Sequence, residues 1–366
     1  MARKSKTSPR GQLRPPPAVG GVPKVLALLL AVTAVIGLVA VLRVDTWGDR
    51  GSGLSDRFEF TLEELATVDP ARVGYQETDQ VAAPLSSVRA LAALPDGGWL
   101  VGGEGAILGF DGEGSPSLEI TVTGEPTGLA VAGDDHPYPG RIYAGMGGRI
   151  ERFGPGGEAL GTWSAGLDEN SVVTSLSVFE DSVLAADAGN RVVVHWDAAG
   201  ELVSVIGRPD PSRNIRGFTV PGGFFEVEVF EDGVLRVTNP GARRIEAYTL
   251  EGDFLGEWGE ASARLEGFFG CCNPSHFAML ADGRFVTAEK GIPRVKIYSD
   301  QGDLETVVAT PEQLSPRLLT SRAFREDQTT IVQGVAVDAA GRVLVLDASQ
   351  RSVRVFEPGG VSSDES

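Results

Sequence analysis

Residues 347–356 read DASQRSVRVF, and the stretches 187–196 (DAGNRVVVHW), 239–248 (NPGARRIEAY) and 289–298 (EKGIPRVKIY) repeat the same pattern. Each stretch begins with an acid or Asn, passes an Arg, and ends nine residues later on an aromatic residue. Short polar turns followed by β-branched and aromatic residues are typical of β-hairpins. The four stretches therefore predict four copies of one hairpin.

An aromatic residue followed four positions later by glycine extends this repeat to six copies. Successive aromatic residues lie 43, 43, 52, 50 and 58 positions apart. Repeats of this period, built of short strands and glycine turns, are typical of propeller blades. We therefore predict an all-β fold, a six-bladed β-propeller spanning residues 70–358. The six aromatic residues are Phe110, Phe153, Trp196, Tyr248, Tyr298 and Phe356.

The strands of the fifth repeat can be assigned from its turns. We expect them at His276–Leu280, Arg284–Ala288, Arg294–Tyr298 and Leu304–Val308. The sixth repeat lacks room for a fourth strand, and residues 72–77 (RVGYQE), just before the first repeat, can supply it. Such pairing closes the ring and removes two open sheet edges.

The four hairpins resemble the NHL repeat, whose blades carry an acid or Asn, then Arg, a β-branched residue and an aromatic residue. The first two blades, with GGEGAILGF (102–110) and GMGGRIERF (145–153), have shorter hairpins and depart from it. The segments GCCNP (270–274) and DGRFVTAEKG (282–291) also resemble a bacterial family of NHL-like proteins. The resemblance implies a six-bladed propeller and supplies no reaction. The arginines that carry it are Arg191, Arg243 or Arg244, Arg294 and Arg351.

The amino end predicts a single transmembrane signal-anchor helix. Residues 25–42 (VLALLLAVTAVIGLVAVL) form an apolar run of eighteen residues, about 27 Å as a helix. Six basic residues and no acid precede this run, so residues 1–24 are expected in the cytoplasm and the remainder outside it. The alternative is a cleaved signal peptide, but the run is long for one and no A-x-A site follows it. Residues 43–69 are expected to be a linker with a short helical turn at 61–66, and residues 359–366 an acidic tail.

Charge excludes one class of partner. The chain carries a net charge of −18, and its first 44 residues hold seven basic residues and no acid, so the remainder carries −25. Such a surface repels phosphate backbones, and we expect no nucleic acid as partner. No motif for a P-loop, a dinucleotide site, a serine hydrolase or a zinc protease lies in a suitable context.

The strongest candidate for a ligand site lies where the chain leads into the fifth blade. The loops leading into blades four to six, at about 207–222, 259–273 and 309–331, are long. In a propeller these loops and the second hairpin of each blade share one face. The second loop ends in GCCNPSH, and the hairpin beside it is EKGIPR. We therefore predict ligand-binding residues Cys271, Cys272, Asn273, His276, Glu289, Lys290 and Arg294.

Two features allow other chemistry. In an oxidising compartment, the adjacent Cys271 and Cys272 can pair only with each other, as a vicinal disulfide. No cofactor or metal is predicted; zinc at His136, His195 and His276 and calcium at the 134–135 hairpin are the alternatives.

Together these features favour a membrane-tethered binding or scaffold propeller for a protein, peptide or cell-envelope ligand. The alternative is an exported enzyme, a metal-dependent lyase or lactonase or a redox protein. It would use the Cys271, Cys272 and His276 region or the central channel.

Overall fold

The computed structural model describes residues 24–43, 62–315 and 331–359. The chain divides into two units, Met1–Phe60 and Thr61–Ser366, which are described separately. The first contains helix α1 (Lys24–Arg43), which coincides with the predicted anchor. Within the described ranges, no helix has both the length and the apolar character needed to cross a membrane. Most of the predicted tails and linker, and most of the 309–331 loop, lie outside these ranges.

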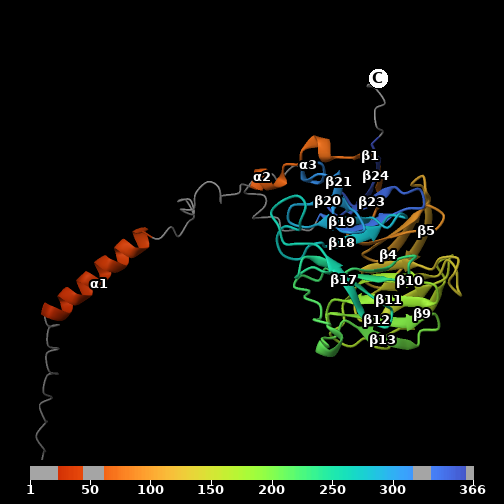
Figure 1. Ribbon diagram of the computed structural model, residues 1–366, viewed down its shortest axis with the longest axis horizontal. Coiled ribbons are helices and arrows are strands. Elements are labelled where there is room, and N and C mark those ends of the chain that lie inside the picture. Colours follow the sequence, from red (N-terminus) through yellow and green to blue (C-terminus); the bar gives the residue numbers. More distant parts are fainter. Residues whose placement is uncertain (1–23, 44–61, 316–330, 360–366) are drawn as a thin grey trace, which may run out of the picture. The chain divides into compact units, whose positions relative to one another are not determined.

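The second unit begins with a short helix, α2 (Leu62–Ala66), where the sequence indicates a helical turn, and then forms six antiparallel four-stranded sheets (Figure 1). Blades one and two contain β2 (Val88–Ala93), β3 (Trp99–Gly103), β4 (Ala106–Phe110), β5 (Pro116–Thr121), β6 (Gly128–Val131), β7 (Ile142–Gly145), β8 (Ile150–Phe153) and β9 (Ala159–Trp163). Blades three and four contain β10 (Val173–Phe179), β11 (Ser182–Asp187), β12 (Val192–Asp197), β13 (Leu202–Ile206), β14 (Val227–Val229), β15 (Leu235–Asn239), β16 (Arg244–Tyr248) and β17 (Phe254–Trp258). Blades five and six contain β18 (His276–Met279), β19 (Phe285–Glu289), β20 (Arg294–Tyr298), β21 (Leu304–Ala309), β22 (Val332–Val337), β23 (Val343–Asp347), β24 (Ser352–Pro358) and β1 (Tyr75–Ala82).

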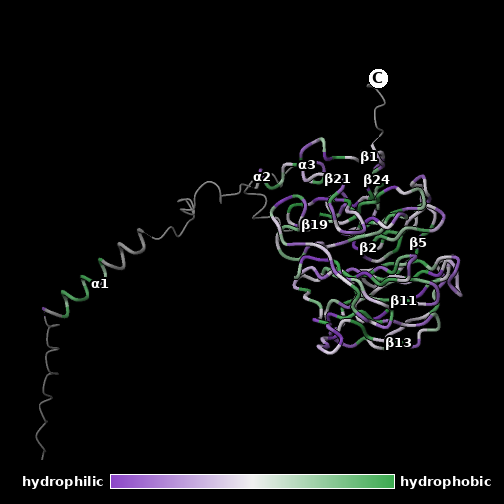
Figure 2. Tube along the Cα trace, viewed as in Figure 1, coloured by the Kyte–Doolittle hydropathy of each residue, from purple (hydrophilic) through white to green (hydrophobic). Residues whose placement is uncertain are grey.

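The sheets pack face to face in a ring. The inner strands β2, β6, β10 and β14 contact one another in turn, and β22 contacts both β18 and β2. Between neighbouring sheets lie apolar clusters; one joins Val286 and Val295 of blade five to Val345 and Phe356 of blade six. In Figure 2, hydrophobic stretches (green) run along the strands of the propeller. The fold is a six-bladed β-propeller.

The aromatic–glycine repeat has a direct structural cause. All six aromatic residues are buried at the ends of the third strands. The glycine four positions later lies in the following turn, and in each described case its φ is positive, from 81° to 95°. Only glycine adopts this backbone conformation without a steric cost from Cβ. The repeat thus records one buried side chain and one turn per blade.

The ring closes through the strand nearest the start of the propeller. β1 pairs antiparallel with β24, from Tyr75 opposite Pro358 to Ala82 opposite Ser352. Closure by the segment before blade one is as predicted, but the strand begins later than residue 72. The reason is that Pro70–Arg72 forms a 3-10 turn, which the Asp69 side chain caps by accepting from the Ala71 N–H.

Arg354 of β24 forms one ion pair with the closing strand β1 and a second with β23 on its other side. The Arg354 guanidinium donates to both carboxylate oxygens of Glu77, at 2.9 and 2.5 Å, and its Nη1 lies 3.4 Å from Asp347 Oδ2. Arg354 and Asp347 are buried, so solvent screens this contact little.

The repeated arginines do not occupy equivalent positions. Arg191, Arg243 and Arg351 each lie in the hairpin turn with φ between 51° and 59°. In blade five this turn position is Pro293, whose ring holds φ near −65°. Arg294 therefore lies one residue later, as the first residue of β20.

Candidate functional site

The loops that lead into the blades are held by the residue that opens each repeated hairpin. These opening residues, at the ends of the second strands, are all buried. In three blades, the side-chain oxygen of the opening residue accepts a hydrogen bond from a backbone N–H of the loop that leads into the same blade. The pairs are Asp187 with Val172 (2.9 Å), Asn239 with Thr219 (2.9 Å) and Glu289 with Phe269 (3.2 Å). The repeated residue is therefore an anchor for the loops of one face.

Blade five replaces the single anchor by a buried ion cluster. Glu289, Arg294 and Lys296 are exposed by only 1, 2 and 0%. Arg294 Nη2 donates to Glu289 Oε2 at 2.8 Å, and Lys296 Nζ lies 2.6 Å from Glu289 Oε1. Burial raises the pKa of Glu289, but the two cations outweigh burial and hold that pKa below its usual value. Burial lowers the pKa of Lys296 to about 8, and the Glu289 carboxylate opposes this effect.

The ion cluster also binds the loop that leads into blade five, at about residues 259–273. Lys296 Nζ donates to the carbonyl oxygens of Leu265 and Gly267, both at 2.9 Å. Its ammonium also lies 5.0 Å from the ring centroid of Phe268. The structure therefore places Glu289 and Arg294, two of the predicted ligand residues, beneath the loop, where they position it.

Asn273 joins the same loop to the second hairpin. Its Oδ1 accepts from the Lys290 N–H at 2.8 Å, and its Nδ2 donates to the carbonyl oxygens of Phe269 and Lys290 at 2.6 and 3.1 Å. Asn273 is buried, so this side chain also has a positioning role.

The two cysteines differ in environment. Cys271 is exposed and Cys272 is buried, and both are free thiols in this structure, so their pairing in a vicinal disulfide stays a prediction. Burial raises the pKa of the Cys272 thiol, and the nearby Lys290 ammonium offsets part of this effect. Cys272 also faces the loop leading into blade four, because a Cβ on Gly222 would lie 3.0 Å from its Sγ and 3.4 Å from Lys290 Nζ.

Side chains of blade four complete the site. Lys290 Nζ lies 4.8 Å from the ring centroid of Phe224, and that ring meets the His276 imidazole edge-on at 5.7 Å. His276 Nδ1–H donates to Glu226 Oε1 at 2.6 Å, while the buried His276 Nε2 has no hydrogen-bond partner among the residues that the structure describes. We call Phe224, Cys271, Cys272, His276 and Lys290 the blade-five surface. Phe224 and Glu226 escaped the sequence analysis; the Gly222–Gly223 turn inside a long loop was the available signal.

The central channel holds two more carboxylates beside this surface. A cavity of about 240 Å³ is lined by all six inner strands; Glu228 lies on β14, and Glu226 is the residue just before it. Burial raises the pKa of Glu228 to about 8, and the nearby Glu226 carboxylate raises it further.

The three histidines do not converge. Nδ1 of His136 accepts from the Tyr138 N–H at 2.9 Å within blade two, and Nε2 of His195 lies 3.0 Å from Ser182 Oγ within blade three. His276 is alone beside the channel. Over the described ranges, no group of three or more His, Cys, Asp or Glu residues is placed to hold a metal ion.

Comparisons with known proteins agree with the fold. The WD40 β-propeller domain of Doa1 is 17% identical, with a TM-score of 0.51, and the match covers 78% of this chain and 98% of that domain. A structural-genomics protein of unknown function from Bacteroides thetaiotaomicron is 14% identical, with a TM-score of 0.55, covering 78% and 73% of the two chains. No family model and no curated protein matches the sequence. These likenesses concern the fold alone.

Replacing Glu289 by Gln should lower the free energy of unfolding by about 3–5 kcal/mol, because two buried cations would lose their counter-charge. Chemical denaturation of the full chain measures this loss. Glu305→Gln is the control: Glu305 pairs with Arg284 at 3.2 Å on the surface of the same blade, and the pair should contribute less than about 1 kcal/mol. Equal losses for the two variants would contradict a supporting role for the cluster.

The raised pKa of Glu228 has a consequence for pH dependence. Between 4.5 and about 8 the folded state binds more protons at this residue than the unfolded state, so the free energy of unfolding falls as pH rises through that window. Glu228→Gln should remove this slope, which amounts to at most about 1.4 kcal/mol of unfolding free energy for each pH unit inside the window. Urea denaturation from pH 5 to 9 measures it. Parallel curves for wild type and variant would show that Glu228 titrates normally.

Proposed function

We propose that the chain is an NHL-type propeller, tethered to a membrane, that binds a protein, peptide or cell-envelope ligand outside the cytoplasm through the blade-five surface. The observation that carries the proposal is that buried side chains hold the loops of this surface in place. The ion cluster and Asn273 hold the loops that carry Cys271 and Lys290, and Asn239 holds the loop that carries Phe224; all three groups are exposed or half-buried. Loops supported on a rigid scaffold are the usual place for recognition.

The chemistry of the surface indicates what a ligand should offer. The Lys290 ammonium can receive an acidic group, and the Phe224 ring beside it can pack against an apolar one. The unpartnered His276 Nε2 can form one further hydrogen bond. A peptide or envelope component that carries an acidic and an apolar group side by side, together with an N–H or O–H that can donate to Nε2, satisfies all three.

The tether is proposed from the sequence of residues 25–42. Helix α1 follows this apolar run, and its Leu28, Leu29 and Leu30 are 58–66% exposed. The basic residues before the run favour a cytoplasmic amino end. Holding the propeller at a membrane would raise its effective concentration near an envelope ligand.

Binding can be tested with the full chain in detergent micelles, using envelope fractions from a bacterial host and quantitative crosslinking. Phe224→Ala and Lys290→Ala should each lower the yield of the crosslinked ligand at least about tenfold, as expected for anchoring residues at an interface. Tyr138→Ala is the matched control, because Tyr138 is an exposed aromatic residue beside Arg141 in blade two. Yields that fall equally in all three variants, or in none, would exclude the blade-five surface. Cys271→Ser with Cys272→Ser tests the cysteines in the same assay.

The tether has a separate test. Full-length protein expressed in a bacterial host should sediment with membranes and resist carbonate extraction, and protease added outside should digest the propeller. Introducing Leu29→Arg and Val32→Arg into the apolar run should release the protein, because each charge at a helix centre costs about 2.5–3.5 kcal/mol on insertion. Wild-type protein that carbonate extracts would disprove the tether and leave the binding surface unaffected.

One observation favours a second function: the Glu226 carboxylate fixes the orientation of the His276 imidazole. A carboxylate on Nδ1 and a free Nε2 are the arrangement of a general base or of a metal-bound imidazole. An exported enzyme with lyase-, lactonase- or redox-type activity would use this residue. About one zinc, iron or calcium ion per purified chain would place that function first.

A further inference from the structure

A cavity separate from the blade-five surface opens between blades three and four, with a volume of about 510 Å³. Three segments line it: Gly166 and Asp168 before β10, the hairpin residues 190–192, and the two ends of the loop leading into blade four. It shares no lining residue with the blade-five surface or the central channel. We call it the blade-three pocket.

Three exposed arginines, Arg191, Arg208 and Arg216, are among the residues that line this pocket. Across the described part of the chain, the side chains of Arg191 and Arg208 make no hydrogen bond, ion pair or ring contact. Arg216 lies 3.6 Å from Glu257, a carboxylate that Arg244 binds more closely. The pocket therefore carries an excess of positive charge, although the chain as a whole carries −18.

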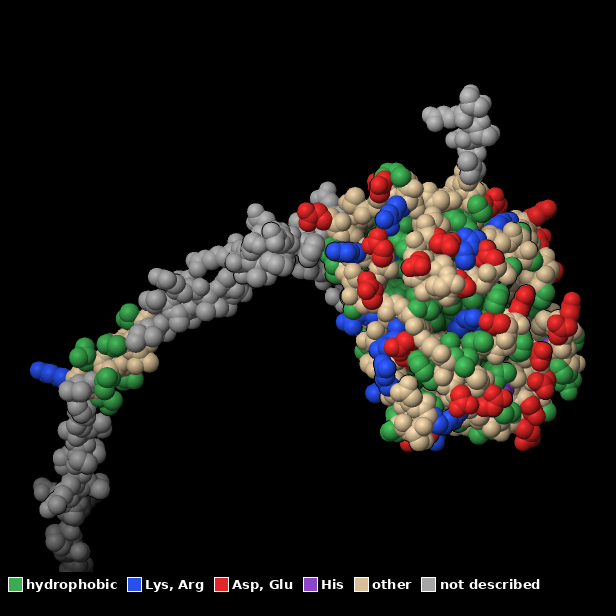
Figure 3. Space-filling view, viewed as in Figure 1, with side chains coloured by type: hydrophobic (Ala, Val, Ile, Leu, Met, Phe, Trp, Pro, Cys, Tyr) green, Lys and Arg blue, Asp and Glu red, His purple; other side chains and the backbone are tan. Residues whose placement is uncertain are grey.

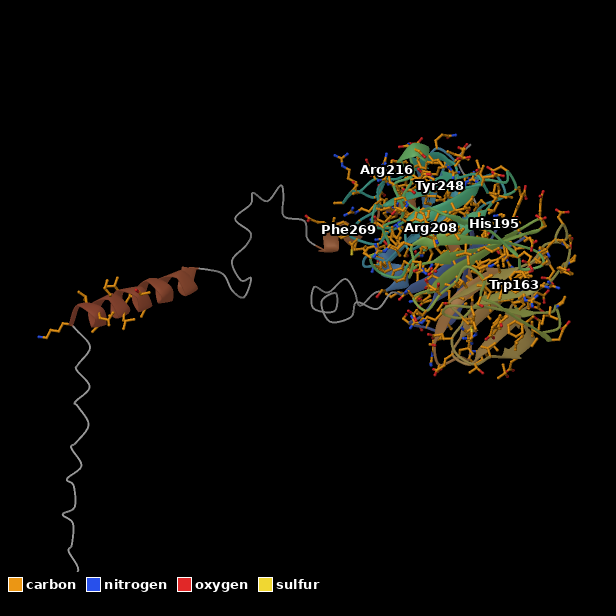
Figure 4. The ribbon with its side chains drawn as sticks, turned by 90° about the horizontal axis from the view of Figure 1, so that it is seen from below. Trp163, His195, Arg208, Arg216, Tyr248 and Phe269 are labelled. Atoms are coloured by element: carbon orange, nitrogen blue, oxygen red, sulfur yellow. The ribbon has the colours of Figure 1, made fainter. Side chains whose placement is uncertain are left out.

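The backbone brings these arginines together. Asp210 and Ile215 exchange two backbone hydrogen bonds of 2.9 Å, which close the loop and bring its ends, at Arg208 and Arg216, to one place. Figure 4 labels both residues. Phe218 packs against Gly207, where any Cβ would overlap its ring, so this end of the loop is also closely packed.

Arg191 reaches the same pocket from a rigid hairpin. Asp187 Oδ1 accepts from the Gly189 and Asn190 N–H groups at 3.1 and 3.2 Å, and the Asn190 side chain donates to Asp168 at 2.9 Å. Arg191 itself lies at φ 59°. The guanidinium of Arg191 is therefore carried on an ordered turn and not on a free loop.

Another carboxylate of this region, Asp253, is engaged outside the pocket. The Asp253 carboxylate pairs with Arg213 at 2.6 Å, in the same loop as Arg208 but outside the pocket. Figure 3 shows Asp and Glu side chains over much of the visible propeller surface, so acidic partners are abundant in this protein. Because Arg191 and Arg208 nevertheless have no acidic partner in the described part of the chain, they indicate that the pocket binds an anionic ligand from solution.

We propose that the blade-three pocket binds the phosphate or carboxylate group of a small polar molecule of about monosaccharide size. The planar guanidinium fork matches the paired oxygens of both anions. Asp168, at the rim, accepts hydrogen bonds, so it favours a ligand whose body carries hydroxyl groups and disfavours a second anionic group there. The cavity volume falls within the range of small-molecule sites.

The test is isothermal titration of the full chain in detergent micelles at low salt with glucose 1-phosphate, glucuronate and glucose. We expect the anionic probes to bind and glucose not to bind, and binding to weaken as salt is added. Arg191→Ala and Arg208→Ala should each weaken binding at least about tenfold, since each removes charge-assisted hydrogen bonds. Binding of one anionic probe alone would identify phosphate or carboxylate as the group recognised, and binding of both would show that the negative charge suffices.

Arg351→Ala is the matched control. Arg351 occupies the same turn position in blade six, at φ 51°, is exposed, and lies outside the pocket. This variant should bind within about twofold of wild type, and thermal unfolding of all variants checks that they fold. If neither anionic probe binds at millimolar concentration, or if Arg351→Ala and Arg208→Ala weaken binding equally, the proposal is overturned.

A second measurement needs no organic ligand. Phenylglyoxal modifies accessible arginines, and peptide mass spectrometry reports the extent at each residue. Inorganic phosphate should protect Arg191 and Arg208 while Arg351 reacts at an unchanged rate. Protection of all three, or of none, would count against a built anion site.

Discussion

The loops that lead into blades three, four and five depend on one interaction, a hydrogen bond from the loop backbone to a buried acceptor at the end of the blade's second strand. A leading loop crosses from one blade to the next, and its backbone N–H groups have no strand partner of their own. Asp187, Asn239 and Glu289 each supply that partner from beneath. Because the acceptor is part of the sheet, each loop takes its position from the rigid ring.

In blade five the acceptor, Glu289, also binds two buried cations, Arg294 and Lys296. One carboxylate and two cations leave an excess positive charge away from water, a costly situation unless other groups compensate it. Here the compensation comes from the loop itself, through the carbonyl oxygens of Leu265 and Gly267 and the face of the Phe268 ring. The ion cluster and the loop above it therefore stabilise each other, and the exposed Cys271 lies two residues after Phe269, which the cluster binds.

The features that could be predicted from the sequence are those that repeat. A buried aromatic residue and a turn glycine with positive φ recur once per blade, so their spacing indicated six blades and even the strands of the fifth. Spacing does not say whether a polar residue of a hairpin points out or in, and Glu289 and Arg294 proved to be buried. It also does not show contacts across blades. Phe224 and Glu226 reach His276 only because the ring packs blade four against blade five. For the same reason the blade-three pocket, which draws on three separate segments, had no signal in the linear pattern.

Closure of the ring by β1 sets the order of events when the protein is made. Glu77 and Arg354, which bind each other across the closing strands, are 277 positions apart in the chain. At about 5–20 residues per second, the first partner waits roughly 15–55 s for the second to be synthesised. During that interval the strand at each end of the incomplete ring has an open edge, the kind of surface through which chains pair with one another. Protection from aggregation during synthesis is thus as much a requirement of this topology as the apolar packing between its blades.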